Sequence, residues 1–340
     1  MPDPWFLWVG NLPVMHSCPE TQEQDCDAIS MPGPPVLTVL IPAFNPGFDW
    51  LLASVKSVTS QTFESLEIIV VDDGGSDGSV DAVRSELDDP RIKWIKQKNM
   101  GKSATINRVI ERARGKYFAV QDADDLSDPS RFEMQVARLE SDSVVAGVFC
   151  GYDLIIKGRR MAPSTRGMTK AECEDSIRNF AMPSHDPTGC YRRDLVAQFP
   201  YAEDLRIGQG IDFILRLGEQ HALERIPGCY YSYRIHSNSI TKTDPSQVMN
   251  SRREAIRRAH DRRDIRFKPS SPMSRFRFDN EVFRIFVVSV KEHLDRKERW
   301  KALRIAWDSI CVSPLDRCYY LPLFHIILPT PLKEWLRKKR

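Results

Sequence analysis

Apolar and polar positions alternate in a regular order over the first half of the chain. Short apolar runs are expected to form five strands, at 36–41, 66–71, 92–95, 117–120 and 144–149. Between them, apolar residues recur at three- and four-residue spacing, which predicts helices near 51–58, 80–87, 103–114 and 129–139. Because strands that are apolar on both faces are covered by helices, this order predicts an α/β fold with a mostly parallel central sheet.

The pattern loosens from residue 150 onward. A hairpin arm is expected at 152–156 with a turn at Lys157-Gly158, followed by a helix at 169–180 and a loop at 181–189. A helix at 211–217 and a strand at 230–233 come next, and charged helices are expected from residue 245.

Polar residues gather in the loops that follow four of the predicted strands. These loops read IPAFNPG, VDDGGSDGS, KNMGK and QDADD. Ligands of open α/β sheets bind beyond the carboxyl ends of the strands, so the four loops are expected to share one crevice. None of them contains GxGxxG or GxxxxGK[ST], which disfavours a dinucleotide-binding fold and a P-loop NTPase.

The carboxylates of QDADD predict metal and phosphate binding. Asp122 and Asp124 leave the end of an apparently buried strand, where carboxylates need a cation or hydrogen-bond donors. Mg²⁺ or Mn²⁺ held by one or two carboxylates and substrate phosphates fits this pattern, and a solvated turn is the competing interpretation. Asp125 has no assigned role, whereas Asp128 precedes Pro129 as a helix N-cap precedes a first-turn proline.

Other residues of the predicted crevice suit a nucleotide. Asp72 or Asp73 can accept a hydrogen bond from a nucleobase or a ribose, and Phe44 can stack on a base. Lys102, beside Gly101 at a helix N-terminus, can meet a phosphate with its charge and with backbone donors. A capped turn is the alternative for the aspartates, and core packing is the alternative for Phe44.

Four segments resemble one enzyme family in the same order: VLTVLIPAFNPG, SVTSQTFESLEIIVVDDGGSDGS, NMGKSATIN and RGKYFAVQDADDLSDPSRFEMQ. A weaker similarity follows in DFILRL and YYSYRIHSNSIT. From residue 36 to about residue 233 the chain resembles the inverting family 2 glycosyltransferases, which have the GT-A fold. The resemblance implies Mn²⁺- or Mg²⁺-dependent transfer of a hexose from a nucleotide sugar, with a UDP-sugar as the expected donor.

The resemblance also implies a role for particular residues. Base-pocket, diphosphate and metal contacts are carried over as follows: Pro42, Phe44 and Asp73 line the base pocket, Asp122 contacts ribose or diphosphate, Asp124 ligates the metal, and His236 approaches the metal or diphosphate. A surface or core position is the alternative for His236. His185, in MPSHDPTG, stands on a loop expected to face the acceptor, with loop packing as the alternative.

The chain departs from the family where the catalytic base is expected. The family has Glu-Asp shortly before the arginine of an LRL-like helix, but IGQGIDFILRL places Gln209 and Gly210 there. Neither residue is a useful proton acceptor. Asp212, two residues later, is the expected base, and a structural carboxylate is the alternative. The departure keeps a non-catalytic nucleotide-sugar-binding module open as a second function.

A nucleotidyltransferase is a third function class that binds nucleotide and metal on an α/β sheet. Such enzymes carry a glycine-rich basic loop after the first strand, and IPAFNPG has no basic residue. Processive synthases that resemble this fold carry QxxRW, but Arg296 stands where its Gln would precede Arg299-Trp300. A single addition in cell-surface polysaccharide or glycolipid biosynthesis is therefore expected, with a carbohydrate or lipid-linked acceptor.

Charge is distributed unevenly along the chain. The formal charge is +3, yet residues 251–340 hold 23 Lys or Arg against 11 Asp or Glu, a net +12 that leaves −9 for the rest. The segment CYYLPLFHIILPTPLKEWLRKKR has an apolar stretch at 319–328 that is too short to span a bilayer. Its aromatics and terminal RKKR fit an anchor on an anionic membrane surface at 319–340, whereas a helix packed on the domain is the alternative. No nucleic-acid partner is expected.

The remaining features concern location and organisation. No run of 18 apolar residues occurs, the eight cysteines are scattered, and MPDPWFLWVGNLP is a poor signal peptide. A cytoplasmic protein is expected, peripheral on the inner face of the membrane. We expect an irregular arm at 1–35, a glycosyltransferase domain at 36–243 with its nucleotide-sugar half ending at residue 150 and its acceptor half at 151–243, and a basic helical region at 244–340.

Overall fold

The computed structural model describes residues 33–236 and 245–263, most of 286–312, and the single residues Tyr320, Leu323 and Ile326. The first part of the chain alternates strands and helices: β1 (Leu37–Ala43), α1 (Phe48–Thr59), β2 (Leu66–Asp73), α2 (Ser79–Glu86), β3 (Ile92–Gln97), α3 (Lys102–Ile110), β4 (Tyr117–Val120), β5 (Leu126–Ser127) and α4 (Arg131–Ser141). The order confirms the predicted strand–helix alternation.

The second part mixes short and long elements: β6 (Val145–Ile156), β7 (Arg159–Met161), α5 (Lys170–Arg178), the 3₁₀ turn η1 (Asp186–Thr188), β8 (Gly189–Arg192), α6 (Arg193–Gln198), α7 (Gln209–Gly218) and β9 (Ala222–Ile235). Two further helices are α9 (Pro245–Arg262) and α11 (Arg299–Val312).

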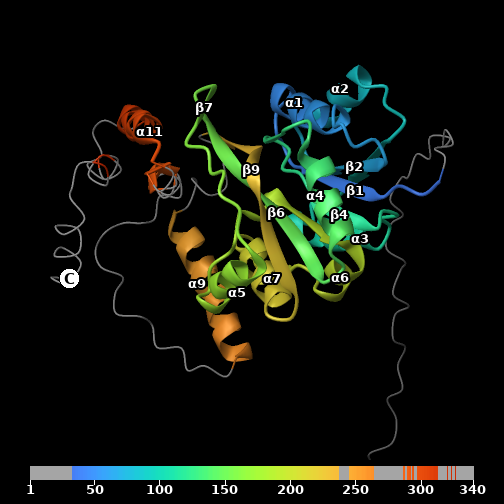
Figure 1. Ribbon diagram of the computed structural model, residues 1–340. Helices are drawn as coiled ribbons and strands as arrows, with labels where there is room; N and C mark the ends of the chain where they lie inside the picture. The colour runs from blue at the N-terminus through green and yellow to red at the C-terminus, as the bar shows by residue number, and fades with distance from the viewer. Residues whose placement is uncertain are drawn as a thin grey trace, which may run out of the picture.

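The described residues form one nine-stranded sheet flanked by helices (Figure 1). The strand order is β3-β2-β1-β4-β8-β6-β9-β5, and β7 pairs only with β6. Strands β3, β2, β1 and β4 are parallel to one another, and β6 is parallel to β9. Strand β8 is antiparallel to both β4 and β6, and β5 is antiparallel to β9, so the sheet as a whole is mixed. The carboxyl ends of the four parallel strands therefore lie along one edge, as the sequence predicts for the crevice.

Helices cover both faces of the sheet. Apolar residues of α1, α2 and α4 pack against one face, including Leu51, Val83 and Phe132. Apolar residues of α3, α6 and α7 pack against the other face, where α7 contributes Phe213 and Leu217. Each strand between these layers needs apolar side chains on both sides, which explains why the predicted strands read as continuous apolar runs.

Several elements differ from the sequence expectation. The fifth predicted strand and the first half of the hairpin arm form a single strand, β6, which turns at Lys157-Gly158 into β7. Strand β9 begins at Ala222, well before the predicted 230, because it runs parallel to β6 along most of its length. The short elements β5, η1, β8 and α6 were not predicted, because two to six residues give too little periodicity to read.

The C-terminal helices pack on the domain. Ala259 of α9 joins the apolar core next to α7. Ala302, Ile305 and Ala306 of α11 pack with Met161 against the arm formed by β6 and β7. None of the helices in the described ranges is long and apolar enough to cross a membrane. The expected domain boundary at residue 243 lies outside the described residues, and so does most of the anchor expected at 319–340.

Candidate active site

The loops after the four parallel strands are joined to one another by hydrogen bonds. In the loop after β1, the side-chain oxygen of Asn45 accepts from the backbone N–H groups of Ser76 (2.6 Å) and Asp77 (3.1 Å), which follow β2. Asn45 has a positive φ of 50°, a conformation that asparagine tolerates better than most residues. The first two loops are thus held as one unit.

Asp73, at the end of β2, holds the loop that follows β3. Its Oδ1 accepts from the side-chain amide of Gln97 and the backbone N–H of Met100, each at 2.8 Å, and its Oδ2 accepts from Gly101 N–H at 2.8 Å. The residue is 4% exposed. These donors satisfy both oxygens, so Asp73 shapes the wall of the crevice; its contact with a nucleobase stays a prediction.

The residues predicted to flank Asp73 in the base pocket differ in exposure. Phe44 is 55% exposed, so a ring face is available for stacking and core packing does not account for it. Pro42 is partly buried in β1. The carboxylate of Asp72 accepts from Gly75 N–H at 2.7 Å. This hydrogen bond forms the capped turn that was the alternative for Asp72 and Asp73.

The fourth loop meets the third through an ion pair. Nζ of Lys102, the first residue of α3, lies 2.5 Å from Oδ1 of Asp122. Burial by itself lowers the pKa of Lys102, but the carboxylates of Asp122 and Asp186 more than offset this and raise it. A protonated Lys102 therefore lies beside the first carboxylate of QDADD, where both can meet a polar ligand.

Asp124 and His236 lie side by side in the crevice. Nε2 of His236, the residue after β9, is 2.8 Å from Oδ2 of Asp124, and their side chains are 14% and 31% exposed. The Trp50 ring of α1 lies 4.2 Å from the His236 ring, centroid to centroid. The two predicted metal ligands, 112 residues apart in the chain, are therefore brought together.

The donor atoms of this pair fit a divalent cation. Two adjacent ligands of an octahedral Mg²⁺ or Mn²⁺, bonded at about 2.1 Å, lie about 3 Å apart, close to the separation of Oδ2 and Nε2. No group of three His, Cys, Asp or Glu side chains in the described part of the chain gathers as a metal site. A cation here would therefore need oxygens of a bound diphosphate, or water, to complete its coordination.

Asp125 fixes the end of β9 beside the crevice. This wholly buried carboxylate accepts from the Tyr231 hydroxyl and from Arg234 N–H, both at 2.7 Å. Burial, and then the charges of Asp124 and Asp122, raise the pKa of Asp125. The contact sets the register between the QDADD loop and β9, and so places His236. Asp125 had no predicted role, although Tyr231 and Tyr233 alternate along a strand that leads to His236.

Arg131 ties the QDADD loop to the η1 turn and is also absent from the sequence predictions. The side chain is wholly buried. Its Nη1 donates to Gln121 (3.0 Å) and Ser127 (2.9 Å), and its Nη2 donates to the carbonyl oxygen of Pro187 (2.5 Å). The guanidinium also lies 4.9 Å from the centre of the Tyr231 ring. Asp128, by contrast, lies two residues before Ser130, which is the N-cap of α4, and accepts from Ser130 N–H in a turn; the predicted capping role of Asp128 is wrong.

His185 lies in a group of aromatic rings rather than against the diphosphate loops. Its ring centre is 5.1 Å from that of Tyr233 and 6.0 Å from that of Tyr152. All three are partly exposed. The predicted contact of His185 with an acceptor stays a prediction, and these neighbours would share it.

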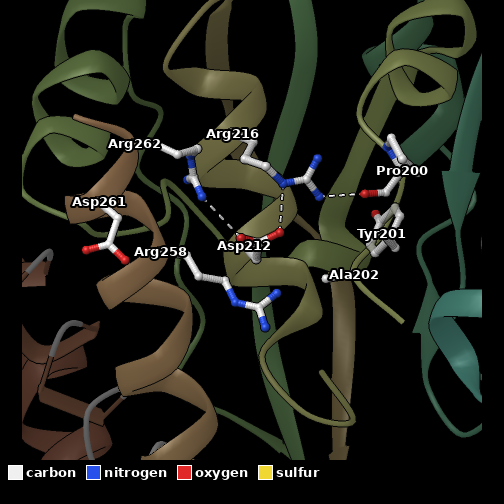
Figure 2. A pocket seen from close by; sticks show the side chains of 8 residues that line it. All are labelled: Pro200, Tyr201, Ala202, Asp212, Arg216, Arg258, Asp261 and Arg262. Atoms are coloured by element: carbon white, nitrogen blue, oxygen red, sulfur yellow. Dashed lines mark hydrogen bonds and ion pairs between the residues drawn. The ribbon is translucent and has the colours of Figure 1, made fainter. Parts of the chain in front are cut away.

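Asp212 faces α9 and has two arginine partners (Figure 2). Its Oδ2 lies 2.7 Å from Nε of Arg216, its Oδ1 lies 3.4 Å from Nη1 of Arg262, and the residue is 2% exposed. It lines a surface pocket of about 450 Å³ with Tyr201, which precedes α7, and with residues of α7 and α9 that include Arg258. The proposed base role of Asp212 has no support in this geometry, because its charge is already bound in ion pairs.

Gly210, where the family carries its base, packs against another carboxylate. A Cβ added at Gly210 would lie 2.8 Å from Oδ2 of Asp186 and 2.7 Å from its Cβ. Asp186 is 8% exposed, and its Oδ1 accepts from the hydroxyls of Tyr201 (3.0 Å) and Tyr191 (3.3 Å). In the sequence, Asp186 could have been noticed because it directly follows His185 in the loop that was expected to face the acceptor.

The strand ends of this mixed sheet carry an Asp-X-Asp pair, a lysine and a facing histidine, on a fold similar to that of the GT-A glycosyltransferases. Residues 38–196 match glycosyl transferase family 2. This match spans a little under half of the chain and supports a family 2 glycosyltransferase of the GT-A fold.

Relatives of the chain carry the same class name. A glycosyltransferase of Rickettsia conorii is 26% identical over 211 residues, which cover 62% of this chain and 35% of the relative. A glycosyltransferase of Haemophilus influenzae is 29% identical over 228 residues, covering 61% of this chain and 68% of the relative. The chain thus spans about a third of the length of the first relative and two thirds of the second. Both are described as uncharacterized.

Solved structures share the fold at low sequence identity. S. aureus TarS 1–349 in complex with UDP-GlcNAc has a TM-score of 0.55 at 15% identity, covering 76% of this chain and 72% of TarS. The mannosyltransferase PcManGT from Pyrobaculum calidifontis, in complex with GDP-Man and Mn²⁺, has a TM-score of 0.50 at 16% identity, covering 89% and 84%. These similarities confirm the predicted GT-A-like α/β fold.

Proposed function

We propose that this glycosyltransferase is metal-dependent and inverting, and that it moves a hexose from a nucleoside-diphosphate sugar to an acceptor hydroxyl. The observation that carries the proposal is the meeting of two pairs at the strand ends, Lys102 with Asp122 and Asp124 with His236. One pair combines a cation with a carboxylate, and the other presents an oxygen and a nitrogen at ligand spacing. A diphosphate needs both a positive partner and a metal site.

The donor is proposed to lie with its base toward Phe44 and its diphosphate toward QDADD. Phe44 has an exposed ring, and Pro42 and Asp73 form the adjoining wall. A UDP-sugar is the first choice of donor. The similar folds support a nucleotide sugar in general, because TarS is found with UDP-GlcNAc and PcManGT with GDP-Man.

Asp124 and His236 are proposed to hold Mn²⁺ or Mg²⁺ together with the diphosphate. The bound cation would neutralise negative charge on the leaving group. Asp122 would hold Lys102 at the diphosphate or accept from a ribose hydroxyl. Trp50, packed on the His236 ring, would keep that ring oriented toward Asp124.

The reaction follows from these positions. The acceptor oxygen bonds to the anomeric carbon as the bond from that carbon to the phosphate oxygen breaks, and the bonding pair leaves with the diphosphate. The anomeric carbon passes through an oxocarbenium-like state, and attack from the opposite face inverts it. The acceptor hydroxyl loses its proton to a base on that face.

The acceptor is proposed to be a carbohydrate or a lipid-linked carbohydrate that docks near His185, Tyr152 and Tyr233. Half-buried aromatic rings give a sugar an apolar surface while their polar ends remain available. Single addition in cell-surface polysaccharide or glycolipid biosynthesis, at the inner face of the membrane, remains the proposed context and rests on the sequence alone.

A thermal-shift panel of nucleoside diphosphates and nucleotide sugars with Mn²⁺ tests the proposal. A cognate nucleotide should raise the melting temperature only with the metal, since ligands that bind the folded state stabilise it. Hydrolysis of the cognate nucleotide sugar should then accompany binding. Tight nucleotide binding without hydrolysis or transfer of any donor would identify a non-catalytic binding module. Absence of any nucleotide-dependent shift would overturn the proposal.

A further inference from the structure

The carboxylate of Asp186 lies where the side chain at Gly210 would project. A Cβ at Gly210 would meet the Asp186 Cβ at 2.7 Å and Oδ2 at 2.8 Å, so an aspartate at 210 and the present Asp186 cannot occupy this space together. The loss of an acid from α7 thus coincides with a carboxylate supplied from η1. This pairing is visible only in three dimensions, because 24 positions separate the two residues.

Asp186 is held in place on one oxygen and left available on the other. Oδ1 accepts from Tyr201 and Tyr191. None of the hydrogen bonds among the described residues ends on Oδ2, the oxygen that faces Gly210. A fixed Oδ1 and an available Oδ2 are what a proton acceptor needs.

The surroundings of Asp186 connect it with the donor-binding loops. Lys102 on α3 lies close enough to lower its pKa, as does His185 on the same turn, and Asp122 acts in the opposite sense. Burial is the largest influence, and the net effect raises the pKa. A carboxylate whose pKa is raised toward neutrality is a better base than one exposed to water.

Arg131 fixes the backbone of this turn against the QDADD loop. It donates to the carbonyl oxygen of Pro187, the residue after Asp186, and to Gln121, the residue before Asp122. The position of Asp186 relative to the proposed donor site is therefore set by a buried side chain rather than by a free loop.

We propose that Asp186 is the general base of the transfer, in place of the residue absent at Gly210. Its Oδ2 takes the proton of the acceptor hydroxyl as the oxygen bonds to the anomeric carbon and the diphosphate leaves with the electron pair. This inference rests on the proposed glycosyl transfer and names the group that completes it.

Hydrolysis of a nucleotide sugar, with water as acceptor, tests the inference on the full chain. The probe is whichever of UDP-GlcNAc, GDP-mannose and the other panel donors the wild type hydrolyses fastest with Mn²⁺. Asp186→Asn keeps the shape and the acceptor for the tyrosines, so UDP binding should stay within threefold while kcat falls on the order of 10²- to 10⁴-fold. Asp186→Glu, a second variant, should retain more activity than Asp186→Asn. Asp153→Asn, at a buried carboxylate of β6, is the matched control and should change kcat less than threefold.

The possible outcomes distinguish an error in the assignment of Asp186 as base from an error in the proposed glycosyl transfer. If wild type hydrolyses a donor and Asp186→Asn does so at the same rate, Asp186 is not the base. Loss of kcat in Asp212→Asn with retention in Asp186→Asn would assign the base to Asp212 instead. A wild type that neither binds nor hydrolyses any donor overturns the proposed function, and the assignment of Asp186 falls with it.

A separate observation concerns the outer face of α11. Two large apolar side chains stand in solvent there, Trp300 at 86% and Trp307 at 64% exposure. Trp300, Arg304, Trp307 and Cys311 are spaced by three or four residues, so they lie along one side of the helix, and all four are exposed. The opposite face of the helix is buried against the β6–β7 arm, so the tryptophans are not its core-facing side.

The charge around these tryptophans is positive. Arg299 and Arg304 are exposed, and Lys301, also exposed, pairs with Glu298 at 2.7 Å. The acidic Asp308 is only 15% exposed and lies 3.6 Å from Arg159. Tryptophan with cations on an exposed helix face is the composition of a surface that rests on anionic lipid headgroups. We infer that this face of α11 docks on an anionic bilayer.

Flotation of the full chain with vesicles tests this docking. Wild type should float with phosphatidylcholine vesicles that contain phosphatidylglycerol and not with phosphatidylcholine alone. Trp300→Ala/Trp307→Ala and, separately, Arg299→Glu/Arg304→Glu should lower the floated fraction at least fivefold. Met134→Ala/Val144→Ala, at exposed apolar residues outside α11, should leave it unchanged. Equal flotation of wild type and both α11 variants, or no flotation of wild type, would overturn the inference.

Discussion

Nε2 of His236 lies 2.8 Å from Oδ2 of Asp124, although 112 residues separate them in the chain. The segments that carry the two residues are tied to each other. Asp124 follows β4, and His236 follows β9, which Asp125 fixes through Tyr231 and Arg234 N–H. The contact between Asp124 and His236 therefore depends on how the loop after β4 is held to the end of β9.

If this pair holds the metal, removing either ligand should strongly weaken metal-dependent nucleotide binding. Asp124→Asn and His236→Gln should each weaken Mn²⁺-dependent UDP binding by at least tenfold, because a site with two protein ligands loses half of them. Titration calorimetry with and without EDTA measures the effect. EDTA should weaken UDP binding to wild type and change little in the variants. Full Mn²⁺-dependent affinity in Asp124→Asn would refute the assignment.

The buried contact between Tyr231 and Asp125 should contribute to stability. Tyr231→Phe removes a donor from a wholly buried carboxylate, which costs about 1–3 kcal/mol of unfolding free energy. Urea unfolding followed by fluorescence measures this loss. The neighbouring Tyr230 is partly exposed, so Tyr230→Phe should change stability by less than about 0.5 kcal/mol. Equal stability of the two variants would show that the hydroxyl of Tyr231 does not matter.

The sequence predicted the part of the site that follows from strand order. Asp122, Asp124 and Lys102 lie at the ends of consecutive parallel strands or the helices after them, and such ends share one edge of a sheet. Asp186 and Arg131 escaped prediction because their roles depend on contacts between loops far apart in sequence. The spacing of apolar residues along the chain carries no information about such contacts.

The direction in which Asp212 points could not be predicted from the sequence. Residues two apart on a helix differ by about 200° in direction, so Asp212 and Gly210 face opposite sides of α7. Gly210 faces Asp186, and Asp212 faces Arg262 on α9. The sequence can place both residues on one helix, but the direction of each depends on how that helix packs.

Arg131 should be among the most sensitive positions for folding. Its charge is wholly buried and is met by neutral oxygens and the Tyr231 ring. Arg131→Met would leave the carbonyl of Pro187 without its donor and should lower the free energy of unfolding by about 1–3 kcal/mol.

Thermal and urea unfolding of Arg131→Met measure that loss against a matched arginine of the same helix. Arg138 is partly exposed and pairs with Asp142 (3.1 Å) and Glu224 (2.6 Å) at the surface, so Arg138→Met should cost only about 0–1 kcal/mol. A loss in Arg131→Met no larger than that in Arg138→Met would contradict the structural role of Arg131.

Glu67 should make stability depend on pH. It is 2% exposed on β2; its Oε1 accepts from Thr38 Oγ1 and Arg114 N–H at 2.7 Å, and its Oε2 lies 3.0 Å from Nε of Arg114. Burial by itself raises the pKa of Glu67, but the hydrogen bonds from Arg114 and Thr38, with the charge of Lys93, lower it overall. The folded state thus favours the ionised carboxylate more than the unfolded chain does.

A lowered folded-state pKa gives stabilisation that is present above the unfolded value, about 4.3, and is lost as the pH falls through the folded value. Glu67→Gln should therefore lose about 1.5–3 kcal/mol of unfolding free energy at pH 7. Its difference from wild type should shrink steadily below about pH 4.5. Urea unfolding at several pH values checks this, with Glu86→Gln, at an exposed residue of α2, as the control. A difference from wild type that is the same at pH 7 and pH 3 would show that the charge of Glu67 does not stabilise the fold.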